Sequence, residues 1–283
     1  MSIPMGGTLI SVLLLAACDV AGARPATQAA RGTATIPLER FRGLLLVPVA
    51  TPDGRQYRLI VDTGAATAIV LFQPDRGQSS STSITTLPFV LVGNLRHGIV
   101  LTHPEVTRMA TALASSFDGV IGLTLFSQHT VEFDLAAGFL KVHEQRPTRK
   151  AQTSCTVPFR IMHGVPIVTA RVGASDSVDL LVDTGSNAAL TLDVPMTGER
   201  DGRTVLGTQT TGVVYGQATP SQAVQFGTCN FSDVPTILRE RQGPGAWQGS
   251  VGLRMWSGAD RLEVDFVHRR LTLIQAACAE CIS

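Results

Sequence analysis

One short pattern occurs twice in this sequence of 283 residues. A run of apolar, strand-forming residues stops at an aspartate followed by Thr-Gly, first as "LIVDTG" with Asp62 and again as "LLVDTG" with Asp183. Such a run predicts a strand that is buried in the core. A carboxylate at the end of a buried strand is costly, because desolvation disfavours its charge unless hydrogen bonds or a partner compensate. Two aspartates in the same costly setting indicate a functional pair.

The pattern belongs to a longer internal repeat. Residues 118–142, "DGVIGLTLFSQHTVEFDLAAGFLKV", match residues 248–274, "QGSVGLRMWSGADRLEVDFVHRRLTLI". Gly122 matches Gly252, and each glycine opens the one segment of its half that is typical of a short helical turn. A charged, proline-containing stretch at 144–155 separates the halves. The repeat predicts two tandem β-barrel lobes with one short helix each, related by a pseudo-twofold axis. An acidic pair follows the helix in both copies: Glu132 and Asp134, Glu263 and Asp265.

Composition favours an all-β fold. The 27 glycines and 15 prolines lie between short runs rich in Val, Ile, Leu, Thr and Phe, and long helical periodicity is absent. Turn signals at 52–54, 93–94, 173–176 and 227–228 predict hairpins. The formal net charge of +1 gives no electrostatic reason to bind nucleic acid or an anionic membrane face.

Residues 1–18 are typical of a secretory signal peptide, because the apolar stretch "TLISVLLLAAC" is too short to cross a bilayer comfortably. Its end, "LAAC", resembles the bacterial lipobox, in which Cys18 is lipidated and becomes the mature N-terminus. No Lys or Arg precedes the apolar run, so an uncleaved anchor or a simple signal cut nearby stays open. Residues 19–35 are small and polar, which predicts a flexible tether to lobes at 36–143 and 156–283. We therefore expect an exported, periplasmic protein held to the bacterial membrane by lipid alone.

Export would place the other cysteines, Cys155, Cys229, Cys278 and Cys281, in an oxidising compartment. Their even number allows three pairings. We expect Cys155 to pair with Cys278 and Cys229 with Cys281, because Cys155 opens the second half and Cys278 follows its last apparent strand. The Cys278-Ala-Glu-Cys281 spacing also suits a redox or zinc site, but no helix is expected there and no His-x-x-x-His pair supplies further ligands. We expect no metal and no cofactor.

The two aspartates have a defined chemistry if the twofold brings them together. Like charges at close range cannot both ionise, so the pair shares a proton and titrates as a unit. One carboxylate then acts as base toward a water molecule while its protonated partner donates to a carbonyl oxygen. The result is water-mediated attack on an amide, without a covalent intermediate.

The motifs carry a family resemblance. Asp62-Thr63-Gly64 and Asp183-Thr184-Gly185, each with a downstream apolar Gly segment, resemble the aspartic proteases, for which the shared-proton pair is an established feature. Each half resembles a retropepsin-type subunit, and the whole is similar to a fused pseudo-dimer of the bacterial periplasmic type over residues 41–274. The resemblance implies that Asp62 and Asp183 are the catalytic dyad. It also implies that Thr63 and Thr184 interlock behind the dyad, and that Gly64 and Gly185 bring amides to the carboxylates.

The family also has flaps, hairpins that close over the substrate. By position they fall at 73–84 in the first half and 207–217 in the second. The first is polar, whereas the second contains Gly212 and Tyr215 and is more typical of a working flap. A pepsin-like enzyme carries its flap tyrosine in the first lobe, so the role of Tyr215 stays open.

The sequence thus predicts a monomeric aspartic endopeptidase of the bacterial envelope that acts on a protein or peptide substrate. The alternative is a catalytically silent, lipid-tethered peptide-binding module that uses the same cleft, which the polar first flap favours. A serine hydrolase is a distant third, since the sequence contains no Gly-x-Ser-x-Gly.

Overall fold

The structure is a computed structural model. It describes residues 33–51, 53–66, 69–71, 85–86, 90–92, 95–97, 101–102, 117–144, 147, 154–174, 177–195, 204–209, 212–241 and 246–275.

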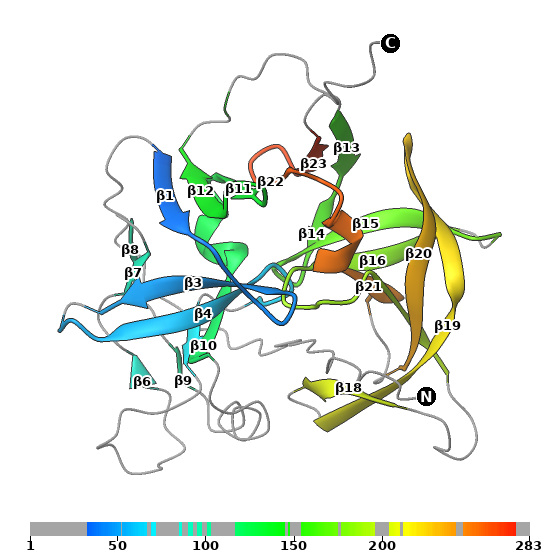
Figure 1. The fold of residues 1–283 in the computed structure, drawn as a ribbon, viewed down its shortest axis with the longest axis horizontal. Coiled ribbons are helices and arrows are strands. Elements are labelled where there is room, and N and C mark those ends of the chain that lie inside the picture. The colour runs from blue at the N-terminus through cyan, green and yellow to red at the C-terminus, as the bar shows by residue number, and fades with distance from the viewer. Residues whose placement is uncertain are drawn as a thin grey trace, which may run out of the picture.

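Three β-sheets make up the described part of the chain (Figure 1): one for each lobe and one that joins them. The first-lobe sheet has nine strands, in the order β6-β9-β5-β10-β4-β3-β7-β8, with β2 paired to β3. Its strands are β2 (Glu39–Phe41), β3 (Leu44–Ala50), β4 (Gln56–Asp62), β5 (Ile69–Leu71), β6 (Thr85–Thr86), β7 (Val90–Val92), β8 (Leu95–His97), β9 (Leu101–Thr102) and β10 (Gly119–Gly122).

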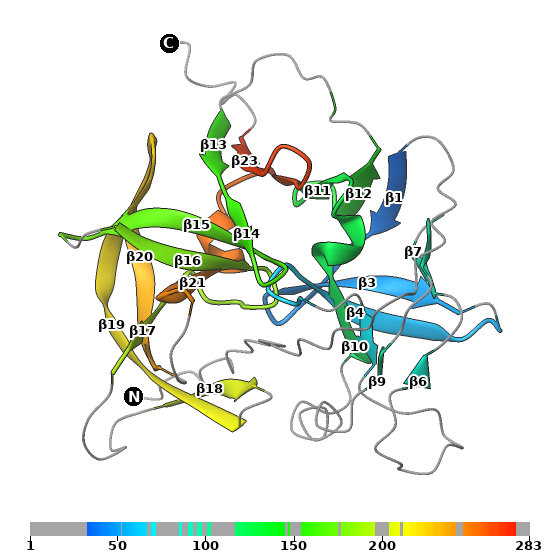
Figure 2. The same ribbon diagram turned by 180° about the vertical axis from the view of Figure 1, so that it is seen from behind.

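The second-lobe sheet repeats this plan with eight strands, in the order β14-β15-β16-β21-β17-β20-β19-β18, and an additional pairing of β15 with β19 closes it into a barrel. Its strands are β14 (Arg160–Met162), β15 (Val165–Val172), β16 (Ser177–Asp183), β17 (Leu190–Val194), β18 (Thr204–Gln209), β19 (Gly212–Phe226), β20 (Cys229–Glu240) and β21 (Gly249–Gly252). Seen from behind in Figure 2, the two lobes lie on either side of the molecule.

The third sheet, called the interlobe sheet below, has six strands and takes three from each half, in the order β1-β12-β11-β22-β23-β13. Its strands are β1 (Thr33–Pro37), β11 (Thr130–Asp134), β12 (Phe139–His143), β13 (Ser154–Pro158), β22 (Arg261–Asp265) and β23 (Arg270–Ile274). The matched strands β11 and β22 pair at its centre, where Glu132 lies opposite Glu263. The matched residues of the repeat therefore meet at the centre of this sheet, as the predicted pseudo-twofold requires.

The predicted hairpins and helices are confirmed. The strands on either side of each predicted turn pair antiparallel: β3 with β4, β7 with β8, β15 with β16 and β19 with β20. Each predicted helix is one short 3₁₀ turn, η1 (Leu123–Phe126) or η2 (Leu253–Trp256). Within the described ranges these are the only helices, and none is long and apolar enough to cross a membrane.

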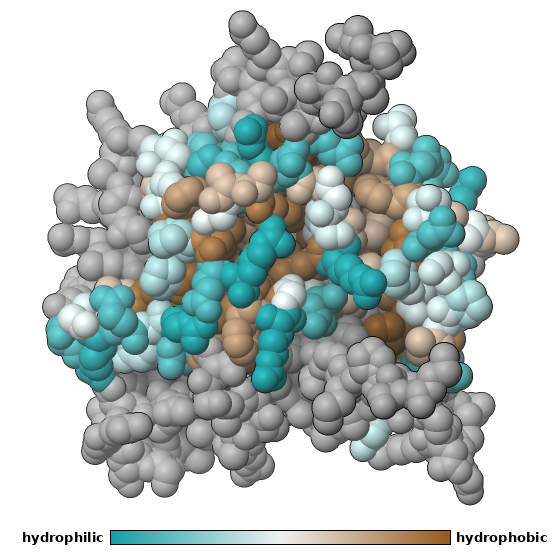
Figure 3. All heavy atoms as spheres, in the orientation of Figure 1, coloured by the Kyte–Doolittle hydropathy of each residue, from teal (hydrophilic) through white to brown (hydrophobic). Residues whose placement is uncertain are grey.

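One core cluster extends through both lobes and the interlobe sheet. The matched aromatics Phe126 and Trp256 are both buried in it, and Trp256 packs against Phe226 and Phe231. Trp247 lies in a smaller cluster with Val165, Ile167 and Leu181. Figure 3 shows apolar residues across the middle of one face, between hydrophilic side chains.

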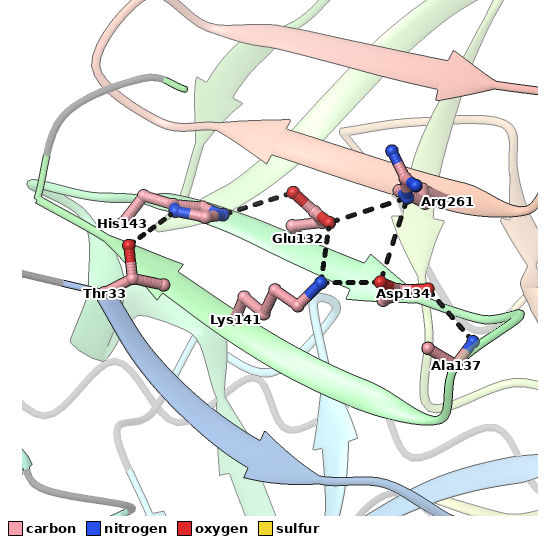
Figure 4. Close-up of polar contacts among 7 residues, drawn as sticks. All are labelled: Thr33, Glu132, Asp134, Ala137, Lys141, His143 and Arg261. Carbon is pink, nitrogen blue, oxygen red and sulfur yellow. Dashed lines mark hydrogen bonds and ion pairs between the residues drawn. The ribbon is translucent and has the colours of Figure 1, made fainter. Parts of the chain in front are cut away.

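Salt bridges and hydrogen bonds hold one face of the interlobe sheet (Figure 4). Glu132 is 1% exposed and interacts with Lys141 at 3.5 Å and with His143 at 3.2 Å. Lys141 also binds Asp134 at 2.6 Å, and Arg261 reaches across from the second half to both carboxylates at 3.8–3.9 Å. The charged residues therefore link the two halves, because buried carboxylates need such partners.

Two predicted boundaries are wrong by a few residues. The expected tether, 19–35, overlaps β1, which begins at Thr33: Ala34 and Ile36 alternate with exposed residues and are buried, while β1 pairs with β12. The expected linker, 144–155, overlaps β13, whose residues Ser154 and Cys155 pair with β23. In both cases a short alternating strand adds to the edge of a sheet formed by distant residues.

The predicted cysteine pairing is also wrong. Cys155 forms a disulfide with Cys229, with a Cα–Cα distance of 5.6 Å, and therefore cannot pair with Cys278. The interlobe sheet places β13 against the start of β20, so that the Cys229 sulfur lies 4.0 Å from the Thr156 carbonyl oxygen. Cys278 and Cys281 lie outside the described residues.

Candidate active site

The two aspartates occupy equivalent places in the two lobes. Asp62 ends β4 and Asp183 ends β16, and both strands change from exposed to fully buried along their length in the same pattern. The parallel neighbours β10 and β21 set Gly122 opposite Asp62 and Gly252 opposite Asp183. Both carboxyl side chains are 0% exposed.

The predicted threonine interlock is present. The Thr63 amide donates to the Thr184 hydroxyl at 3.0 Å, and the Thr184 amide donates to the Thr63 hydroxyl at 2.9 Å. Each hydroxyl in turn donates to a carbonyl oxygen of the opposite lobe, Thr184 to Val61 at 2.8 Å and Thr63 to Val182. Four buried hydrogen bonds thus fix the two motifs against each other.

The glycines of the motifs allow the carboxyl groups to meet. A Cβ added to Gly64 would lie 3.1 Å from Asp62 Oδ1 and 3.2 Å from Asp183 Oδ1, so both oxygens converge on one point. A Cβ on Gly185 would lie 2.5 Å from Asp62 Cγ, which no side chain tolerates. Only glycine permits this approach, and the two aspartates therefore form one site.

Few hydrogen bonds offset the burial of these carboxyl groups. The Gly64 amide donates to Asp62 Oδ1 at 2.7 Å. Asp62 Oδ2 and both oxygens of Asp183 accept no hydrogen bond of standard geometry from the described residues. Three oxygens thus keep lone pairs for a ligand in the site.

Burial raises the pKa of both aspartates. For Asp62 the charge of Asp183 adds to desolvation, and the pKa lies well above its usual range. For Asp183 desolvation is opposed by the charge of Arg239, by a hydrogen bond with Asp62 and by the amides of Gly185 and Ser186, and the pKa rises to about 6. The two carboxyl groups therefore titrate as a coupled pair that holds a proton to a higher pH than a free aspartate does, and the charge of Arg239 favours the charged form of Asp183.

A turn of each lobe also contacts the residues just after the Asp-Thr-Gly motif of the other lobe. The side-chain amide of Asn187, just after the second motif, donates to the Arg42 carbonyl oxygen in the β2–β3 turn at 3.2 Å. In the matched position, the β14–β15 turn at Gly164 packs against Ala66, just after the first motif. The site is therefore built from both lobes, and neither lobe is sufficient for it.

The flap predictions have different outcomes. The expected second flap, 207–217, lies in a hairpin in which β18 and β19 pair antiparallel, with Gln209 opposite Gly212 and Val205 opposite Tyr215. Tyr215 is half-buried on β19. The expected first flap, 73–84, and the lipidation residue Cys18 lie outside the described residues.

Sequence reasoning missed Arg239 and Asp193. Arg239 on β20 is 4% exposed and binds Asp193 on β17 through two hydrogen bonds. The sequence did contain one signal for this pair. When the two halves of the repeat are aligned, the first half has no acid and no arginine at the places of Asp193 and Arg239. Across the described ranges, no group of three or more His, Cys, Asp or Glu residues is arranged to hold a metal ion.

Replacing Thr184 with valine should lower the free energy of unfolding by about 2–4 kcal/mol, because the buried Thr63 amide and Val61 carbonyl each lose a partner. Urea denaturation measures the change. The control is Thr228→Val in the exposed β19–β20 turn, which should change stability little. Equal stability of the two variants would show that the interlock does not hold the lobes together.

Known proteins resemble this chain in structure, but the searches by sequence found no match. No protein-family model and no curated protein matches the sequence. An aspartic proteinase from Irpex lacteus aligns over 88% of this chain and 99% of its own, with 14% identity and a TM-score of 0.49. Basic 7S globulin from soybean aligns over 88% of this chain and 96% of its own, with 11% identity and a TM-score of 0.52. The chain therefore has an all-β, two-lobed fold, which it shares with basic 7S globulin.

Proposed function

We propose that this protein is an aspartic endopeptidase that cleaves peptide bonds with a water molecule activated between Asp62 and Asp183. The observation that carries the proposal is the pair of fully buried carboxyl groups whose oxygens converge on one point. Burying two carboxyl groups whose pKa values burial raises destabilises a fold at neutral pH, so their presence in both motifs calls for a function.

In this proposal Asp183 is the base and Asp62 the acid, because the charge of Arg239 favours the charged form of Asp183. Asp183, charged, accepts a proton from water, and the hydroxyl attacks the carbonyl carbon of the peptide bond. Asp62, protonated, donates to the carbonyl oxygen and stabilises the tetrahedral intermediate. Transfer of the proton from Asp183 to the amide nitrogen, with return of the proton on the former carbonyl oxygen to Asp62, then breaks the C–N bond and releases the amine. Both aspartates return to their starting states, and no covalent enzyme intermediate forms.

The pH dependence follows from these roles. The pKa of Asp183, raised to about 6, must be exceeded before the base is charged, so kcat/KM should rise with pH through this value. Activity should fall again above the higher pKa of Asp62, when the pair loses its shared proton. A bell-shaped profile with a weakly acidic to neutral optimum is expected from initial rates, and a peak below about pH 3 would contradict the assignment.

A digest of a peptide library with the purified protein tests the activity. New amino termini, identified by mass spectrometry, should appear at internal peptide bonds. A peptide with a non-cleavable hydroxyl isostere of the tetrahedral intermediate should suppress them, because it resembles the transition state. Cleavage that is insensitive to this inhibitor would point to another hydrolase.

A binding module without turnover is the second candidate. A protein that shares this fold carries the name of a globulin, so the fold by itself does not assign hydrolysis. This candidate predicts that the isostere and the library peptides bind in calorimetry while no peptide is cut.

The setting that we propose is the bacterial envelope, with a lipid anchor at Cys18 supported by the "LAAC" sequence after an apolar stretch. Metabolic labelling with a fatty acid should mark the protein in bacteria, and Cys18→Ser should remove the label and release the protein from the membrane fraction. A variant that stays labelled would refute the anchor.

A further inference from the structure

Two buried hydroxyl groups near the dyad lack a partner. Ser250 on β21 is 1% exposed and Thr191 on β17 is 2% exposed. The two residues lie opposite each other in the second-lobe sheet, and neither hydroxyl oxygen has a hydrogen-bond partner among the described residues. A buried hydroxyl without a partner lowers stability, and valine at the same place would avoid that loss. Packing alone therefore does not explain the pair.

The strand register places both hydroxyls on the same face of the sheet as Asp183. Strand β21 lies between β16 and β17 (Figure 2), with Ser250 opposite Leu181 and Gly252 opposite Asp183. Side chains alternate along a strand, so Leu181 and Asp183 point to one face, and the register partners of Leu181 share it. The row formed by Leu181, Ser250 and Thr191 thus lies two residues, or about 7 Å, from the dyad.

This face is turned toward the first lobe and away from the barrel core. The alternate residues of the same strands belong to the large core cluster: Leu180, Val182, Leu190 and Val251. Leu181 instead packs in the small cluster with Trp247, and Ala66 of the first lobe packs against that cluster. Because Ala66 closely follows the first Asp-Thr-Gly motif, the row lies at the boundary between the lobes, where the two aspartates act on a substrate.

The first lobe has an apolar row at the matched place. In its register, the places of Leu181, Ser250 and Thr191 are taken by Ile60, Val120 and Val70. Ile60 and Val120 are fully buried. The strands that carry the dyad are otherwise closely repeated, as "LIVDTG" and "LLVDTG". The two hydroxyls are therefore a difference between two equivalent surfaces, and they lie on the side of Asp183.

The charged groups further along this face are already paired. One step of the strands away from the dyad, Asp179 is bound to Arg160 and Asp193 is bound to Arg239. A hydroxyl group donates one hydrogen bond and accepts others, but it does not compensate a buried full charge. The group that satisfies the two hydroxyls is therefore neutral and polar, as in the side chains of Asn, Gln, Ser and Thr.

We propose that Ser250 and Thr191 line a substrate subsite that accepts a neutral polar side chain, while Ile60 and Val120 line an apolar subsite on the other side of the dyad. The inference rests on the proposed function, in which the dyad cleaves a peptide bond. Consecutive side chains of an extended peptide point in opposite directions, so each lobe receives one of the two residues that flank the scissile bond. The enzyme therefore cleaves between an apolar residue and a neutral polar one.

The cleavage sites in a peptide library test this preference. Aligned at the scissile bond, they should show apolar residues on one side and Asn, Gln, Ser or Thr on the other. For two peptides that differ only in Asn or Leu at the polar position, kcat/KM should favour Asn by about 10-fold or more. Apolar residues on both sides of the cleaved bonds would overturn the inference.

Substitution of both hydroxyl residues tests the assignment to this row. The double variant Ser250→Val, Thr191→Val copies the first lobe, and its preference for Asn over Leu should fall by about 10–100-fold. The control is Thr236→Val on β20, a buried threonine opposite Leu190 whose hydroxyl already donates to the Val234 carbonyl oxygen at 2.9 Å. The control should alter stability without changing the preference. A double variant with the wild-type preference would refute the assignment, because a purely structural role changes stability and not selectivity.

Binding of non-cleavable peptides gives the same readout without turnover. The peptides have a hydroxyl isostere at the scissile bond and carry Asn on one side of it, on the other side or on neither, and calorimetry measures their Kd. The wild-type protein should bind one of the two Asn peptides about 10-fold more tightly than the peptide without Asn, and the double variant should not. If no peptide is cut, the proposed activity fails, while this comparison still reports on the subsite. The same order of Kd values in both proteins would overturn the inference, whatever the activity.

Discussion

Asp62→Asn and Asp183→Asn should each lower kcat by at least about 10³-fold, while the fold is retained. Asparagine has nearly the same shape as aspartate but neither accepts nor donates a proton in the reaction. The two losses should not multiply in the double variant, because the residues act as one unit. Initial rates on a peptide identified in the library digest measure the effect.

Asp183→Asn should also raise the free energy of unfolding at neutral pH. Burial raises the pKa of Asp183 to about 6, above the value of about 3.9 in an unfolded chain. The folded protein therefore binds this proton more tightly, so the carboxyl favours folding below about pH 4 and opposes it as the pH rises through 6. Asp183→Asn should gain on the order of 2–3 kcal/mol above this range, measured by urea denaturation.

A matched control lies on the same strand. Asp179 is partly exposed, and its hydrogen bond with Arg160 lowers its pKa. Asp179→Asn should keep most of the activity and should lose stability at neutral pH instead of gaining it. Full activity of either dyad variant would contradict the proposed mechanism, whereas a loss of activity shared by Asp179→Asn would indicate general damage to the strand.

Gly185→Ala should lower kcat/KM by about 10²-fold or more, because the new methyl group would lie 2.5 Å from Asp62 Cγ and must displace it. Gly64→Ala should have a smaller effect, since its nearest contacts are at 3.1–3.2 Å. The stability cost of the overpacked Gly185→Ala site should be about 1–3 kcal/mol.

Gly258→Ala is the control for the glycine series, because its added Cβ would have only Gln275 Nε2 at 4.0 Å. Its kinetics should match those of the wild type. From highest to lowest kcat/KM, the expected order is thus Gly258→Ala, Gly64→Ala and Gly185→Ala. A Gly185→Ala enzyme as active as Gly258→Ala would show that the carboxyl groups do not meet as closely as the structure indicates.

The repeat made much of the fold predictable. Hydrophobic runs that end at "VDTG" predicted β4 and β16, and the matched glycine segments predicted β10, β21 and both short helices. Local signals sufficed here, because strand, turn and motif are neighbours in sequence. Symmetry made Asp62 and Asp183 equivalent, and their meeting as a pair was predicted from the family resemblance of the two motifs.

What the sequence left open depends on contacts between distant segments. The pairing of Cys155 with Cys229 depends on how β13 of the interlobe sheet lies against β20, which no spacing rule encodes. The start of β1 at Thr33 depends on an edge that β12 offers more than a hundred residues later. Arg239 reaches Asp193 across 46 residues, and its importance comes from burial, which a polar residue in a strand does not reveal.

The most direct test of a proton-sharing pair is the titration of Asp62 with and without charge on its neighbour. In ¹³Cγ-labelled wild-type protein, NMR should show Asp62 titrating well above its usual range, in part because of the charge on Asp183. In Asp183→Asn that charge is gone, and the pKa of Asp62 should fall by about one unit or more while staying raised by burial. An Asp62 titration at the same pH in both proteins would show that the two carboxyl groups do not act as a pair.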